Sequence, residues 1–331
     1  MSLKYIIFWV LTLITFLVII VIFSLTLGVA GIPAGKMVSV FLHGPGSTEY
    51  SIIFDIRLPR IILAFAVGGS LSLAGVLLQG MFRNSLVEPY TLGISGGAAL
   101  GVSISIVLGL AAISRFTFPL FGSLGASMVI GILYLLSLKK VRINLQRLLL
   151  IGIMISFISS SLVMLLMSLS SMDSLHGIVF WIMGSLAESD GTLIQIMLAA
   201  SLGLLAVSYL FCHHLNAFAL GEEEAHHLGI PVESTKRILF LASSLLTGFC
   251  VSAAGMIGFV GLVVPHFMRR VVGHDHRILL VSSFLAGAIF LIVCDTVARI
   301  IIAPVELPVG VVTGIVGGSI FVYALAKEDI S

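Results

Sequence analysis

Residues 59–82 read PRIILAFAVGGSLSLAGVLLQGMF, an apolar run without a single acidic side chain. A helix rises about 1.5 Å per residue, so this run is long enough to cross a hydrocarbon core about 30 Å thick. Pro59 suits the first helical turn, where its missing N–H is not needed. The stretch therefore predicts a transmembrane helix.

The composition of the whole chain also indicates a membrane protein. The chain has 331 residues, 59% of them apolar, with 17 Lys and Arg and 15 Asp and Glu. Only 10% of its residues are charged, against about 25% in an average soluble domain, and its mean hydropathy is +1.22. This excludes a water-soluble enzyme, a disordered chain and a disulfide-stapled secreted scaffold. The net charge of +2 gives no sign of a nucleic-acid partner.

Apolar runs recur along the chain between Gly, Pro and charge clusters. Each is read as a helix, which predicts an all-α polytopic membrane protein with about ten transmembrane helices. The first run exceeds the apolar core of a signal peptide and no convincing cleavage site follows it, so it is kept as a span. Besides residues 59–82, the runs are 5–27, 92–110, 116–136, 146–169, 193–212, 236–253, a Gly-broken 258–272, 278–302 and 308–325.

Two connections are too long to be simple turns. Residues 29–56 contain the short apolar stretch 37–42, and residues 170–190 contain the apolar stretch 177–184. Neither stretch is long enough to span a membrane. Both are expected to form short interfacial or re-entrant helices.

The basic residues predict the orientation, because cytoplasmic loops are enriched in Lys and Arg. With the N-terminus inside, five basic residues lie outside: Lys36, Arg57, Arg60, Arg115 and Arg299. The other twelve lie inside: Lys4, Arg83, Lys139, Lys140, Arg142, Arg147, Lys236, Arg237, Arg269, Arg270, Arg277 and Lys327. The reverse orientation inverts this ratio, so both termini are predicted to be cytoplasmic.

Glycines recur at four-residue spacing on two predicted helices, at Gly93, Gly97 and Gly101 and again at Gly310, Gly314 and Gly318. Such a stripe lets another helix approach closely. The partner could be a helix of the same bundle or a second subunit, and the sequence leaves both readings open.

Three polar segments interrupt the apolar pattern and are the candidates for function. They are residues 79–97, 215–229 and 258–277. The second has an apolar side, with Leu215 and Leu220, beside the acidic run Glu222–Glu224. Three glutamates would be repelled by anionic lipid, so docking onto a soluble partner protein fits better than lying on the membrane.

Most spans hold no ionisable residue near their middle. A proton- or sodium-coupled transporter would be expected to place Asp, Glu or Lys there, so this pattern argues against a secondary transporter. An intramembrane enzyme would need a paired constellation such as His-Glu-x-x-His, which is absent. The adjacent His226 and His227 point about 100° apart on a helix, so no metal site is expected.

The three segments resemble the FecCD family of permeases, the membrane subunits of binding-protein-dependent ABC importers for iron-siderophores, haem and cobalamin. The motifs are Arg-Leu-Pro-Arg at 57–60, Gln-Gly, Arg-Asn, Glu-Pro and Leu-Gly within 79–93, Trp-x-x-Gly-Ser at 181–185, Leu-Gly-Glu…Leu-Gly at 220–229, Gly-Phe-Val-Gly-Leu…Pro-His…Arg at 258–269, Asp-Thr…Arg at 295–299 and Glu-Leu-Pro-x-Gly at 306–310. Ser85 and Ser319 stand where the family usually has Pro. Neither change alters a charge.

The resemblance implies a type II ABC importer permease fold in a single transmembrane domain over residues 1–331. It implies a second permease copy (homodimer or heterodimer), two cytoplasmic ATPase subunits and an extracytoplasmic substrate-binding protein. The protein would lie in the bacterial or archaeal cell membrane and pass an iron-siderophore, or a haem- or cobalamin-like chelate, inward. An oxyanion of the molybdate or tungstate type is the alternative cargo. The chain has no phosphate-binding loop, so ATP would be bound by the partner and no cofactor or enzymatic activity is expected of this subunit.

The resemblance also assigns roles to residues. Arg57, Arg60 and Arg299 would pair with acidic side chains of the binding protein, since a guanidinium can grip a carboxylate with two hydrogen bonds. Lipid phosphates or local carboxylates are the alternative partners, above all for Arg299, because Asp295 precedes it by four residues. The coupling segment, residues 215–229, would enter a cleft of the ATPase through Leu215, Asn216, Leu220, Gly221, Glu222, Glu224, Ala225, Leu228 and Gly229.

A third group would close the inner mouth of the pathway: Asn84, Leu86, Asn144, Leu145 and Gln146. Ordinary capping of loops is the alternative for these five. The hydroxyls of Ser156, Ser159, Ser160 and Ser161 could line the pathway, or bond to the backbone of their own helix.

Overall fold

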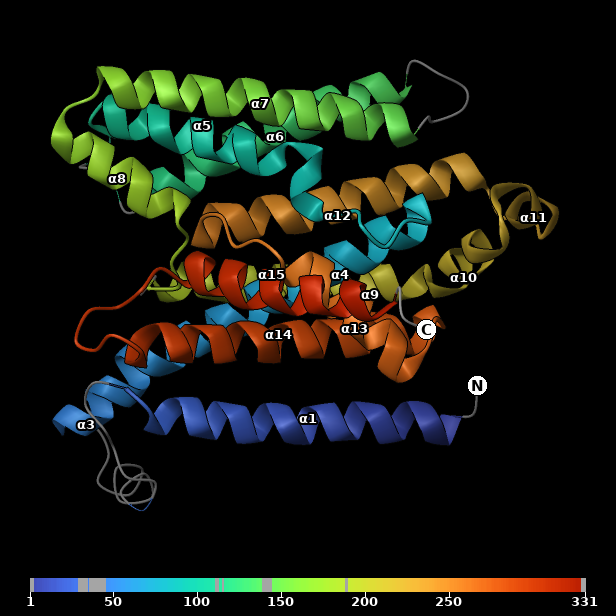
Figure 1. The fold of residues 1–331 in the computed structure, drawn as a ribbon, viewed down its shortest axis with the longest axis horizontal. Helices are drawn as coiled ribbons and strands as arrows, with labels where there is room; N and C mark the ends of the chain where they lie inside the picture. Colours follow the sequence, from blue (N-terminus) through green and yellow to red (C-terminus); the bar gives the residue numbers. More distant parts are fainter. Residues whose placement is uncertain are drawn as a thin grey trace.

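The computed structural model describes residues 3–28, 35, 46–110, 113–114, 116–138, 145–187 and 190–328. Every regular element in these ranges is helical, and the longer helices lie side by side in one bundle, with no strand among them (Figure 1). The all-α prediction is confirmed. The elements are α1 Leu3–Thr26, α3 Thr48–Ser51, η1 Ile52–Arg57, α4 Leu58–Phe82, η2 Pro89–Leu92, α5 Ile94–Val107, α6 Thr117–Leu138, α7 Leu145–Leu169, α8 Met172–Ile182, α9 Gly191–Leu210, α10 Cys212–Leu220, α11 Glu222–His227, α12 Val232–Ala254, α13 Val260–Val272, α14 His276–Ile300 and α15 Val309–Glu328.

Eight stretches of helix within the described ranges are long and apolar enough to cross a membrane. All ten predicted runs are helical, but two of them are too short to be complete spans. Helix α5 has 14 residues and α13 has 13, which correspond to about 20 Å of helix. Both begin after a residue in the left-handed conformation, Gly93 (φ 77°) and Phe259 (φ 68°). The predicted runs 92–110 and 258–272 begin two residues before α5 and α13, and the first of them also extends three residues past the end of α5.

Helix α4, which was predicted over residues 59–82, lies at the centre of the bundle. It packs against α9, α12, α13 and α14, and nearly all of its side chains are buried. Two glycines allow this packing. A Cβ at Gly68 would lie 2.4 Å from the carbonyl oxygen of Gly287 in α14, and one at Gly75 would lie 1.9 Å from that of Gly261 in α13. The backbones therefore touch where a side chain would separate them.

The two glycine stripes differ in what they face. In α5, a Cβ at Gly97 would meet Val129 and the Gly125 carbonyl of α6, and Gly101 lies against the Phe121 carbonyl. This stripe packs within the bundle. In α15, Gly310 packs on the carbonyls of Met183 and Met256, whereas nothing lies within 4 Å of a Cβ at Gly314.

The two long connections also contain helix. Residues 48–57 form α3 and a π-helix that continues directly into α4, and α8 occupies 172–182. The apolar stretch 37–42 lies outside the described residues. Both chain termini lie at one end of the bundle together with α10 and α11, and α3 and α8 lie at the opposite end (Figure 1). We call these the α11 end and the α8 end.

Candidate functional site

The three predicted docking arginines gather at the α8 end. Arg57 comes from the π-helix, Arg60 from the first turn of α4 and Arg299 from the last turn of α14. All three are buried, with exposed fractions of 4%, 7% and 6%. A buried guanidinium is costly unless carboxylates or hydrogen-bond acceptors surround it.

Two carboxylates hold Arg60. Its Nε lies 2.7 Å from Oδ1 of Asp295, and its Nη1 lies 2.6 Å from Oε2 of Glu306. The other Asp295 oxygen accepts from Nε of Arg299 at 3.1 Å. Asp295 is thus a buried anion shared by two arginines. We call Arg57, Arg60, Asp295, Arg299 and Glu306 the arginine cluster.

The arginine cluster also fastens α1 to the bundle. Nη2 of Arg299 donates to the hydroxyl of Ser24 at 2.8 Å, and Thr296 donates to the same hydroxyl at 2.8 Å. Arg57 donates to the backbone carbonyl of Leu25. The local carboxylates weighed as alternative partners are therefore present for Arg60 and Arg299, and docking of a second protein stays a prediction.

The coupling segment is two short helices joined at Gly221, whose φ of 140° suits glycine. Its apolar residues divide into two sets. Leu215 and Ala225 are fully buried and anchor the segment, while Leu220 and Leu228 are 65% and 64% exposed. The segment thus presents two leucines beside an acidic surface at the α11 end.

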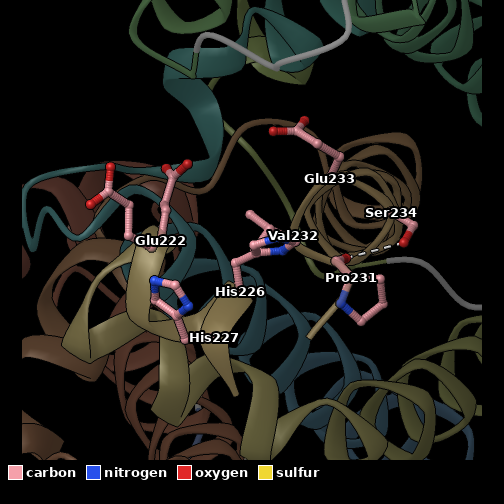
Figure 2. A pocket seen from close by; sticks show the side chains of 8 residues that line it. Glu222, His226, His227, Pro231, Val232, Glu233 and Ser234 are labelled. Atoms are coloured by element: carbon pink, nitrogen blue, oxygen red, sulfur yellow. Dashed lines mark hydrogen bonds between the residues drawn. The ribbon is translucent and has the colours of Figure 1, made fainter. Parts of the chain in front are cut away.

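An internal ion pair fixes the orientation of α11. Lys236 in α12 is only 2% exposed, and its Nζ lies 2.6 Å from Oε2 of Glu222 and 3.7 Å from Oε1 of Glu233. A pocket of about 530 Å³ separates α11 from the start of α12, as Figure 2 shows. It is lined by Glu222, Glu223, His226, His227, Pro231, Val232, Glu233 and Ser234.

Asn216 faces inward, although it is predicted among the coupling residues. Its side-chain oxygen accepts from the backbone N–H of His276 at 2.8 Å, and its nitrogen donates to Asp275 at 2.9 Å. Asp275 in turn caps α14 by accepting from the N–H of Arg277. The Arg277 guanidinium holds the pKa of the Asp275 carboxyl well below its usual range. Asn216 therefore joins α10 to a charged cap of α14.

The predicted gate residues that the structure describes follow α4 or begin α7. The side chain of Asn84 accepts from the N–H of Leu86 at 2.9 Å and so closes a turn, as the capping alternative expected. Leu86 is 55% exposed. Leu145 and Gln146 open α7, and Asn144 lies outside the described residues.

A set of hydrogen bonds joins Gln79, Glu88 and Tyr90 to residues 257–269, and it was not among the predicted sites. We call this set the clasp. Glu88 accepts from the N–H of Phe259 at 2.8 Å, and the hydroxyl of Tyr90 accepts from the N–H of Ile257 at 2.9 Å. Gln79 donates to the carbonyl of Gly261 and accepts from Arg269. The signal was a Gln near the end of an apolar helix, followed by a Glu and a Tyr in a short connection that needed neither of them.

This clasp borders a groove of about 470 Å³ between α5, α7 and α15. No charged side chain is found among its described lining residues, which include Ser156 and Ser160. Ser159 is instead buried against Gly96. The lining comprises Tyr90, Ser95, Gly96, Ser156, Ser160, Ile182, Met183, Met256, Gly258, Phe259, Gly310, Val311 and Gly314.

Eight helices in the described ranges are long and apolar enough to cross a membrane, and this arrangement is that of an integral membrane protein. The model of the FecCD transport family matches residues 16–327, so the chain belongs to this family. The chain is therefore the permease subunit of an ABC importer.

Relatives and a solved structure agree with this. The chain is 40% identical to the hemin transport system permease protein HmuU of Yersinia pestis over 84% of each chain. It is 34% identical to the vitamin B12 import system permease protein BtuC of Klebsiella pneumoniae, over 97% of this chain and 94% of that one. A structure described as an inward-facing metal-chelate type ABC transporter superposes with a TM-score of 0.86 at 32% identity, covering 96% of this chain and 98% of the other.

Proposed function

We propose that this permease passes an iron-siderophore, or a haem- or cobalamin-like chelate, from an extracytoplasmic binding protein into the cytoplasm. The observation that carries the proposal is the uncharged groove, with its aromatic, methionine and hydroxyl lining. Such walls suit a large chelate, whereas a proton- or sodium-coupled pathway would be expected to carry ionisable side chains. The names of the hemin and vitamin B12 relatives support the same class of cargo.

The binding protein of the same importer tests the cargo. We expect the cognate binding protein to bind a ferric siderophore, haem or cobalamin when each is titrated into it. Tight binding of molybdate or tungstate, with none of the chelates bound, would instead support the oxyanion alternative.

We further propose that ATP hydrolysis in two partner ATPase subunits drives transport, and that a second permease copy completes the pathway. In this arrangement the α11 end and both termini face the cytoplasm, and the α8 end faces the binding protein. The excess of basic residues predicted to lie inside supports this orientation. All 331 residues would act as one permease domain in a bacterial or archaeal cell membrane.

The coupling segment is the proposed ATPase contact, and its exposed leucines give a direct test. Replacing both Leu220 and Leu228 with aspartate should weaken binding of the cognate ATPase at least about tenfold, because each leucine buries apolar surface in the complex. Affinity would be measured with the purified permease in lipid nanodiscs. Met172→Asp, at an equally exposed apolar position of the α8 end, is the control. Unchanged affinity in the folded double variant would rule out this contact.

A further inference from the structure

The arginine cluster has one member that is open to solvent. The side chain of Glu306 is 46% exposed, whereas those of Arg60 and Asp295 are 8% and 1% exposed. Glu306 lies at the end of the exposed stretch 301–306, between α14 and α15. An acidic group arriving at the α8 end therefore meets Glu306 before it can reach Arg60.

The two carboxylates on Arg60 differ in how easily they can leave. Asp295 is buried and is also bonded to Arg299, so its removal would strand two guanidinium groups. Among the residues that the structure describes, Glu306 pairs with Arg60 alone, and water can solvate its carboxylate after it separates from Arg60. The Nη1 side of Arg60 is thus the side that can exchange its carboxylate.

We propose that Glu306 is a displaceable internal ligand of Arg60, occupying the position that an acidic side chain of the binding protein takes on docking. This rests on the docking role predicted for Arg60. The partner chemistry is an Asp or Glu carboxylate on the surface of the binding protein, since such a group reproduces the bond that it replaces. Docking is then an exchange of one carboxylate for another on a preformed buried arginine.

Such competition lowers the affinity for the binding protein. The apparent Kd equals the intrinsic Kd divided by the fraction of permease in which Arg60 is uncovered. A half-exposed ion pair of this kind corresponds to about a fivefold preference for the covered state. Removing Glu306 should therefore tighten docking by about that factor, while removing Arg60 should weaken it.

The first test needs the permease alone. Phenylglyoxal modifies accessible guanidinium groups, and peptide mass spectrometry reports the rate at Arg60. We expect Glu306→Ala to raise that rate about fivefold, and Glu306→Gln to raise it less because its amide oxygen can still accept from Arg60. Glu49→Ala, which removes the same charge from α3 at the same end, is the control. A rate at Arg60 that Glu306→Ala leaves unchanged, with thermal unfolding also unchanged, would overturn the proposal.

The second test uses the assembled importer, with the permease and its ATPase in nanodiscs and the cognate binding protein as the probe. We expect Glu306→Ala to lower the Kd about fivefold and Arg60→Gln to raise it. If Arg60→Gln leaves the Kd unchanged, the docking assignment itself is wrong. If Arg60→Gln weakens binding while Glu306→Ala has no effect or also weakens it, docking at Arg60 stands and displacement of Glu306 is wrong.

Discussion

Replacing Asp295 with alanine should lower the free energy of unfolding by about 3–5 kcal/mol. Asp295 is 1% exposed and accepts from both Arg60 and Arg299. Without it, the partners of Arg299 in the described part of the chain are the Ser24 and Thr296 hydroxyls and the Leu27 carbonyl, and a buried charge without a counterion is strongly destabilising.

The change can be measured as the shift in denaturant-induced unfolding of the purified permease in detergent. Asp295→Asn should be nearly as damaging. It keeps the shape of the side chain and removes only the negative charge, so its effect reports the loss of the counterion shared by Arg60 and Arg299. Asp173→Ala, at an exposed position of α8 at the same end, should change stability little. Equal stability of all three variants would show that the arginine cluster does not hold α4 and α14 together.

Gly75→Ala should be comparably damaging for a steric reason. The added Cβ would lie 1.9 Å from the carbonyl oxygen of Gly261, so α4 and α13 would have to separate. Overpacking of this kind costs about 1–3 kcal/mol and more where backbone is the obstacle. Because α13 begins beside the groove, we also expect transport to fall in this variant.

The matched control is Gly131→Ala in α6. Nothing lies within 4 Å of a Cβ at that position, and alanine is the better helix former, so stability should be retained or rise slightly. Both variants would be followed by thermal unfolding in detergent. A Gly75→Ala protein as stable as Gly131→Ala would contradict the close contact between α4 and α13.

Much of the fold follows from the sequence because long apolar runs in a membrane can satisfy their backbone only as helices. The run at 59–82 is the buried central helix α4, as its uniform apolarity allows. The short lengths of α5 and α13 were not predictable in the same way. They depend on left-handed residues at Gly93 and Phe259 and on the bonds from Glu88 and Tyr90 to distant backbone N–H groups.

In the candidate sites, too, some contacts were predictable from the sequence and others were seen only in the folded structure. The pair of Arg299 with Asp295 follows from four-residue spacing on one helix, and the exposed Leu220 follows from the amphipathic pattern of its segment. Glu306 lies 246 residues from Arg60, so its contact required the folded structure. Asn216 lies in a segment predicted to contact the ATPase, yet its side-chain amide is hydrogen-bonded to Asp275 and to the backbone N–H of His276 at the start of α14.

Uptake into sealed vesicles tests the central claim most directly. The permease and its cognate ATPase would be reconstituted in proteoliposomes that expose the α8 end outward, with the binding protein and a radioactive ferric siderophore, haem or cobalamin outside and nucleotide inside. We predict accumulation that requires both ATP and the binding protein and that persists when proton and sodium gradients are collapsed. Uptake that proceeds without ATP and stops when those gradients are collapsed would contradict the account.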